Sequence, residues 1–98
     1  MKHIVILSNA DTLSGQVIEK EFIMKTGYAE LTFNTNQIVH IHFKIPPQSL
    51  QDEMLLLTGD TLKGIVSPDV IGLKLESSSQ VIEIEKEDIH TIMFLDNV

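Results

Sequence analysis

The sequence of 98 residues contains no cysteine, no arginine and no tryptophan. The absence of cysteine excludes disulfides, thiolate metal sites and a cysteine nucleophile. No apolar run approaches the roughly 18 residues that a membrane-spanning helix needs, and the apolar stretch at 4–7 is too short for a signal peptide. There is also no Gly-rich phosphate loop and no His-x-x-x-His pair. We therefore expect a cytoplasmic protein that is not an enzyme, has no cofactor and does not enter a membrane.

Positive charge is scarce as well, because seven Lys stand against 14 acidic residues and give a formal net charge of −7. Residues 1–49 hold four Lys and four acids, whereas residues 50–98 hold three Lys and ten acids. The acids of the second half alternate with Ile, Val and Leu, which indicates a solvated sheet face rather than a disordered tail. Affinity for nucleic acid rests on Lys and Arg that neutralise phosphates. The composition therefore argues against DNA binding and disfavours RNA binding.

Two sequence patterns occur twice in the chain. The segment 11–17, Asp-Thr-Leu-Ser-Gly-Gln-Val, returns at 60–66 as Asp-Thr-Leu-Lys-Gly-Ile-Val, an offset of 49 residues. The pattern Ile-x-x-Ile-x-Phe at 38–43 returns at 89–94, an offset of 51. The two extra residues fall in a turn of the second copy, where a duplicated hairpin tolerates an insertion. The duplication predicts three segments packed together as one unit: a first β repeat at 1–44, a linker at 45–52 and a second β repeat at 53–98.

Each copy is expected to form five short strands, because its apolar residues alternate with polar ones between turn sequences. Asp11 and Asp60 lie in the first turn of their copies, where an Asp side chain bonds to nearby backbone amides. Gly15 and Gly64 interrupt the next strand, where a glycine marks a bend, a bulge or a close approach of backbones. We assign a structural role to all four residues.

The linker between the copies contains two prolines, Pro46 and Pro47, which cannot donate to a strand ladder. Ser49, followed three residues later by Asp52, favours a single helical turn. The alternative is that a strand has already begun at Met54.

This arrangement resembles the Sm and Sm-like (Lsm) family of small, SH3-like β-barrels. The family's first motif, alternating apolar residues, a Leu-x-Asn-Gly turn and then apolar-x-Gly-x-apolar, is similar to residues 4–17, and the second copy is similar too. Its second motif, an apolar strand, a turn and Ile-x-x-Ile, is similar to residues 31–41. The resemblance implies an all-β fold with two five-stranded, strongly bent barrels in tandem.

The family's RNA-binding motifs are missing from both copies. Sm-like proteins that bind RNA use an Asp-x-x-Met-Asn loop between the second and third strands, where this chain has only residues 18–21 and 67–69. They also use an Arg-Gly pair between the fourth and fifth strands, where this chain has Asn34-Thr35 and Glu85-Lys86. A carboxylate in place of the arginine repels a phosphate.

The function expected first is therefore a non-catalytic binding or assembly module. Sm-like barrels join into rings when the fourth strand of one barrel pairs with the fifth strand of the next, so we expect a homo-oligomer, with a ring as one form. The alternative is an RNA-binding Sm-like protein that uses the neutral first repeat. Its candidate contacts are Lys20, Tyr28, Asn34, Asn36 and Gln37.

A weaker hypothesis is a metal or pH-responsive site built from histidines. His40 and His42 are two residues apart on an expected strand and so share a face. His3 is expected nearby, because the first and last strands are neighbours in such barrels. No third ligand stands at a known metal spacing, so a solvent-facing polar role is favoured and no bound metal is expected.

Overall fold

The computed structural model describes residues 2–44 and 50–95, which form ten strands and two 3-10 turns. The elements are β1 (His3–Leu7), β2 (Thr12–Val17), β3 (Glu21–Lys25), β4 (Glu30–Asn34), η1 (Thr35–Gln37), β5 (Ile38–His42), β6 (Asp52–Leu56), β7 (Thr61–Ser67), β8 (Val70–Leu75), β9 (Val81–Glu85), η2 (Lys86–Asp88) and β10 (Ile89–Phe94). The prediction of an all-β protein is confirmed. Nowhere in these described ranges is there a helix that is long and apolar enough to cross a membrane.

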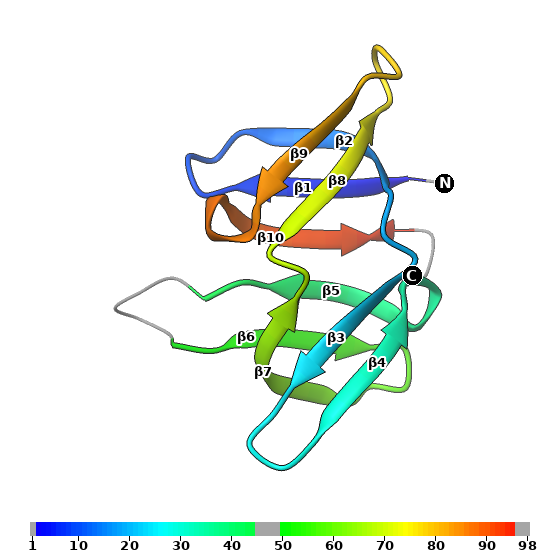
Figure 1. The fold of residues 1–98 in the computed structure, drawn as a ribbon. Helices are drawn as coiled ribbons and strands as arrows, with labels where there is room; N and C mark the ends of the chain where they lie inside the picture. The colour runs from blue at the N-terminus through cyan, green and yellow to red at the C-terminus, as the bar shows by residue number, and fades with distance from the viewer. Residues whose placement is uncertain (1, 45–49, 96–98) are drawn as a thin grey trace.

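The strands form one antiparallel sheet that curls at both ends. Its order is β4-β3-β7-β6-β5-β10-β1-β2-β8-β9. The strands β6, β5, β10 and β1 run side by side through the middle, and the hairpins β3–β4 and β8–β9 fold across them (Figure 1). The curl gives the sheet an inner face and an outer face, and the apolar core lies on the inner face.

The two halves of the chain are interleaved in this sheet. The strands β1 and β2, from the first half of the chain, pair with β10 and β8 from the second half. In the same way β6 and β7 pair with β5 and β3. A central ladder between β5 and β10 joins the two sides of the sheet. Each five-strand side therefore contains strands from both predicted repeats, and neither segment of the chain has a complete sheet of its own.

Irregularities of pairing occur at corresponding places on the two sides. The β1–β10 ladder shifts register between Ile6 and Leu7, which leaves His90 without a partner residue in that ladder. The β5–β6 ladder shifts between Ile38 and His40, and Val39 is the residue without a partner there. Val39 and His90 are separated by the 51-residue offset found in the sequence.

The turns that follow β1 and β6 have the same backbone hydrogen bonds. The Leu7 N–H donates to the Asp11 carbonyl at 2.8 Å, and the Leu56 N–H donates to the Asp60 carbonyl at 2.9 Å. Both turns contain a residue in the left-handed region, Ala10 with φ 75° and Gly59 with φ 93°. The Asp11 carboxylate accepts from the Asn9 amide at 3.2 Å. Both aspartates therefore lie in tight turns that reverse the chain.

Gly15 and Gly64 lie where a neighbouring strand passes against the backbone. A Cβ at Gly15 would overlap the carbonyl group of Lys74 on β8, and a Cβ at Gly64 would overlap that of Lys25 on β3. Both contacts join strands from different halves of the chain. A glycine at these positions therefore permits the close approach that closes each curled side.

The core is one continuous cluster that spans both sides of the sheet. It follows the alternation seen in the sequence, because residues two apart on a strand share a face. Its members are Val5, Val17, Phe22, Met24, Ile38, Ile41, Phe43, Met54, Leu56, Val66, Ile71, Leu73, Ile84, Ile89, Ile92 and Phe94. Phe22 and Phe94, one from each half of the chain, meet edge to face at 6.1 Å between ring centroids.

The described part of the linker is short. Pro46, Pro47 and Ser49 lie outside the described residues. Leu50 and Gln51 form a bend, and β6 begins at Asp52, so Met54 lies in a strand.

Candidate functional site

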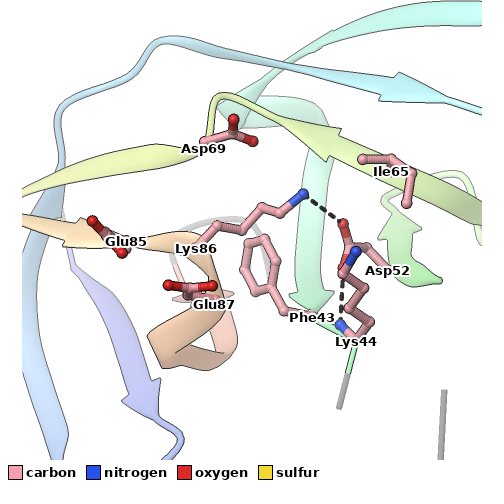
Figure 2. Close-up of a pocket in the computed structure, with 8 residues that line it drawn as sticks. All are labelled: Phe43, Lys44, Asp52, Ile65, Asp69, Glu85, Lys86 and Glu87. Carbon is pink, nitrogen blue, oxygen red and sulfur yellow. Dashed lines mark hydrogen bonds and ion pairs between the residues drawn. The ribbon is translucent and has the colours of Figure 1, made fainter. Parts of the chain in front are cut away.

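A pocket of about 590 Å³ opens where β5, β6, β7 and η2 meet. Its lining combines two lysines, four carboxylates and two apolar side chains, and Figure 2 draws them all: Phe43, Lys44, Asp52, Ile65, Asp69, Glu85, Lys86 and Glu87.

Asp52 forms the buried end of the pocket. It is the first residue of β6 and shares the core-facing side of that strand with Met54 and Leu56, so its side chain is fully buried. One carboxylate oxygen, Oδ1, accepts the Lys44 N–H at 2.8 Å. The other, Oδ2, accepts the Val66 N–H at 2.9 Å. The carboxylate thus satisfies backbone donors of two different segments.

Lys86 reaches Asp52 from the turn between β9 and β10, which belong to the other five-strand side of the sheet. It is the first residue of η2, and its side chain is only 11% exposed. Its Nζ donates to Asp52 Oδ2 at 3.2 Å (Figure 2). It also donates to the Val66 carbonyl at 2.7 Å. Desolvation of a buried ion pair offsets much of its Coulombic attraction, and what remains depends on such additional hydrogen bonds. The pair therefore fixes η2 against β6 and β7, with both charges occupied and neither available as a base or nucleophile.

The mouth of the pocket is acidic. Glu85 and Glu87 flank Lys86 in the chain, and Asp69 lies above it (Figure 2). A hydrogen bond to Glu87, and then the negative charge of that carboxylate, raise the pKa of Glu85. A phosphate or another anion entering here would meet three carboxylates before reaching Lys86, so the pocket disfavours anions.

His3 occupies the position that corresponds to Asp52 in the first half of the chain. Its Nδ1 accepts the Val17 N–H at 2.9 Å, as Asp52 accepts the Val66 N–H at the same length. Both pairs are related by the 49-residue offset. The His3 ring is buried and packs edge to face against Phe94 at 4.9 Å. The expectation that His3 lies near His40 and His42 is therefore wrong, because its side chain faces the core.

A different histidine, His90, joins His40 and His42 on the outer face of the sheet. The His40 and His42 rings lie 4.2 Å apart between centroids, and His42 and His90 lie 6.4 Å apart. Partial burial, and then the neighbouring His40, lower the pKa of His42. In the part of the chain that the structure describes, no group of three or more His, Asp or Glu side chains is arranged to hold a metal ion.

The five candidate RNA contacts lie at the two ends of β4. Four of them lie at η1 or in the loop beside it: Lys20, Asn34, Asn36 and Gln37. The Thr35 N–H donates to the Lys20 carbonyl at 3.0 Å, which holds that loop against η1. Tyr28 is 78% exposed at the tip of the β3–β4 hairpin, at the opposite end of β4. The five residues of β4 separate them by about 16 Å.

The pairing of Asp52 with Lys86 does not follow from the sequence patterns above. They place Asp52 three residues after Ser49 in a predicted helical turn, and Lys86 beside the carboxylate that stands where the family has an arginine. The available signal was the alternation of Asp52, Met54 and Leu56, which places an acid on the core face of a strand, where a buried carboxylate requires partners.

The outer edges of the sheet are the remaining candidate site. No described strand pairs with the far side of β4 or of β9. The Thr26 N–H donates to the Ala29 carbonyl in the β3–β4 turn. Because hydrogen-bonded and non-hydrogen-bonded pairs alternate, the backbone groups of Glu30, Thr32 and Asn34 point away from β3. The Asn34 N–H is accepted by the Gln37 side chain at 2.9 Å.

The described residues therefore present three features: a pocket closed at its inner end by an ion pair, an outer histidine face and two strand edges. At the edges, backbone groups of β4 and β9 point away from the sheet. Neither a protein-family model, nor a curated protein, nor a solved structure matches this chain.

Proposed function

We propose that this chain is a non-catalytic assembly module, built from two interleaved Sm-like repeats, that associates with a second copy of itself through the outer edge of β4. The observation that carries the proposal is the residue pattern of β4, which is complementary to itself. The Sm-like assignment is supported by strand order, because each side of the sheet places its strands by repeat position as fifth, first, second, third and fourth, with the fourth at the edge.

The proposed association differs from the ring of Sm-like barrels, in which a fourth strand pairs with the fifth strand of the next barrel. The fifth strands are β5 and β10, and each is already paired on both sides, with each other and with β6 or β1. The strands left for pairing between chains are the two fourth strands, β4 and β9. Three antiparallel combinations follow: β4 with β4, β9 with β9, and β4 with β9.

Self-pairing of β4 about its central residue places no two charged side chains opposite each other, and the Asn34 N–H must leave the Gln37 side chain to join the ladder. Thr32 would lie opposite Thr32 of the second copy, with the outward N–H and C=O groups of both residues exchanged. Glu30 would lie opposite Asn34, so the one acid of the strand meets a neutral amide. Leu31 would lie opposite Phe33, and both side chains are half-buried and available for further burial. Such cross-strand pairs contribute roughly 0.2–1 kcal/mol each.

The combinations that use β9 bring carboxylates together. Centred self-pairing of β9 places Glu83 opposite Glu83. Pairing β4 with β9 in the corresponding register places Glu30 opposite Glu85. Like charges directly opposite each other destabilise a ladder. The acidic second repeat therefore protects its own edge, while the neutral first repeat leaves an edge open to pairing.

A matched pair of proline variants tests this proposal. Thr32→Pro removes an outward N–H of β4 without removing a bond to β3, and Glu83→Pro does the same at the corresponding place on β9. Light scattering of the wild type over a range of concentrations should show a mass rising from 11.0 kDa towards twice that value. The Thr32→Pro variant should stay monomeric, and the Glu83→Pro variant should behave as the wild type. A wild type that is monomeric at every concentration, or a dimer that survives Thr32→Pro, contradicts the proposal.

A further inference from the structure

A second pocket, of about 410 Å³, lies on the outer face of the sheet over β1, β10 and β5, away from both edges. Its walls are mostly apolar and include Ile6, Leu7 and Met93. Two imidazoles, His42 from β5 and His90 from β10, also line it. Apolar walls with a few convergent polar groups are typical of small-molecule sites, and the volume lies within their usual range.

A buried hydroxyl sets the protonation pattern of the two imidazoles. Thr91 is 3% exposed, and its Oγ1 lies 2.9 Å from His42 Nδ1 and 2.6 Å from His90 Nδ1. A hydroxyl has only one proton to donate. A buried hydroxyl needs an acceptor for its proton, and these two nitrogens are the partners that the described residues give it. In the neutral state one Nδ1 therefore accepts the Thr91 proton, and the other donates its own N–H to the Thr91 oxygen.

The Nε2 atoms of the two rings must then have opposite hydrogen-bonding roles. An imidazole that accepts at Nδ1 carries its proton on Nε2, and an imidazole that donates at Nδ1 has a lone pair on Nε2. Whichever ring takes which state, the pair presents one donor and one acceptor. The ring centroids are 6.4 Å apart, and both residues line the same pocket.

The charges around the pocket disfavour an anion. Glu53 on β6 lies opposite His42 in register, and His40 lies beside His42 on β5. The Ser8 N–H donates to the Asp88 carbonyl at 2.9 Å, so the acidic turn η2 adjoins the segment that follows β1. The lining residues from β1 and its turn are not titratable. The charged or titratable neighbours of the two histidines are therefore acidic groups and other histidines.

From these observations we infer that the outer pocket is a binding site for a neutral ligand with an amide-type edge, one hydrogen-bond acceptor beside one donor, on a small apolar body. The acceptor of the ligand meets the Nε2–H of one histidine, and its donor meets the Nε2 lone pair of the other. The apolar body lies against Ile6, Leu7 and Met93. This binding function is separate from the proposed assembly through β4 and does not depend on it.

The protonation state of the two histidines distinguishes an amide ligand from a carboxylate ligand. When both rings are protonated, both Nε2 atoms become donors, and an amide loses the acceptor that its N–H requires. A carboxylate has two acceptors, so its binding would strengthen on protonation. Amide binding should therefore weaken as the pH falls through the lowered pKa of His42, and carboxylate binding should show the opposite trend.

Histidine ring signals in NMR titrations of the full chain test the inference, with benzamide, benzoate and methyl benzoate as probes. A ligand of this size should bind with a dissociation constant on the order of 1–10 mM. At about pH 7.5 benzamide should shift the signals of His42 and His90, and the other two probes should bind at least tenfold more weakly. Lowering the pH through the lowered pKa of His42 should weaken benzamide binding.

One matched pair of variants locates the site. His90→Val introduces the residue that stands at the corresponding place in the first half, Val39, and should weaken benzamide binding at least tenfold while the melting temperature stays close to that of the wild type. Val39→Ala changes the corresponding place on the other side of the sheet and should leave binding unchanged. The inference is overturned if benzamide does not shift the His42 and His90 signals, if benzoate binds more tightly than benzamide at about pH 7.5, or if His90→Val binds benzamide like the wild type.

Discussion

The buried pair of Asp52 and Lys86 should be replaceable by the neutral residues that occupy its corresponding positions, but only if both are changed together. The first half of the chain has His3 where the second has Asp52, and Thr35 where the second has Lys86. Asp52→His alone leaves the Lys86 ammonium without its counter-charge, although its bond to the Val66 carbonyl remains. Removing one partner of a buried ion pair costs about 3–5 kcal/mol in the free energy of unfolding.

Lys86→Thr and the double variant complete a double-mutant cycle for this ion pair. Lys86→Thr leaves the Asp52 carboxylate buried but still bonded to two backbone N–H groups, so the lower end of that range, about 3 kcal/mol, is expected. In Asp52→His with Lys86→Thr no unpaired charge remains, and the new imidazole can accept the Val66 N–H as His3 accepts the Val17 N–H. The remaining losses are the bond from the Lys44 N–H and the bond from Lys86 to the Val66 carbonyl, about 1–2 kcal/mol together.

Urea unfolding followed by far-UV circular dichroism measures these free energies by linear extrapolation. Two single losses that sum to about 6–8 kcal/mol, against about 1–2 kcal/mol for the double variant, give a coupling near 5 kcal/mol. Each single loss is comparable with the whole stability of a small domain, so the single variants need a temperature near that of maximum stability. If the double variant loses the sum of the single losses within about 0.5 kcal/mol, the ion pair does not account for the cost and the reasoning fails.

Three further predictions concern stability. Gly15→Ala should cost about 3 kcal/mol or more because its Cβ overlaps the Lys74 carbonyl, whereas Gly27→Ala, with open space around it, should be neutral or slightly stabilising; equal urea midpoints would contradict this. The lowered folded-state pKa of His42 means that the unfolded chain binds the proton more readily. The free energy of unfolding that neutral His42 contributes is therefore fully present above the unfolded pKa of about 6.5. It is lost as the pH falls from there through the lowered pKa of the folded state. Melting temperatures recorded from about pH 7.5 to 5.5 should fall, and the fall should be smaller in His42→Gln. Residues 1–49 alone should lack a cooperative melt as a monomer, since β1, β2, β3 and β5 each lose a paired strand; a concentration-independent cooperative melt would refute this.

Local features of the fold were accessible from the sequence because they depend on neighbouring residues. The alternation of Ile71 and Leu73 with Gly72 and Lys74 is typical of a strand, and these residues lie in β8, which pairs with β9 across the turn between them. In the same way Gly27 lies in the turn between β3 and β4. Both are hairpins, in which pairing and chain order agree.

The interleaving was not accessible, because the repetition that reveals the two copies also makes their strands alike. Val17 on β2 pairs with Leu73, and Val66 on β7 pairs with Met24. An apolar residue at the same strand position was available within either copy, so periodicity does not distinguish the partners. The bond between Lys86 and Asp52 joins residues 34 apart in the chain that lie on different sides of the sheet. Part of the candidate site was therefore hidden with the topology.

The interleaved ladders make the covalent connection between the two halves dispensable for holding them together. Four ladders, β1 with β10, β2 with β8, β5 with β6 and β3 with β7, together with the central ladder, cross from residues 2–44 to residues 50–95. A chain cut between these ranges after folding would remain one particle, held as a non-covalent heterodimer. New termini placed at this cut, with the original ends joined, would give a circular permutant with the same sheet. The molecule can thus be regarded as a dimer whose two subunits happen to be translated as one polypeptide.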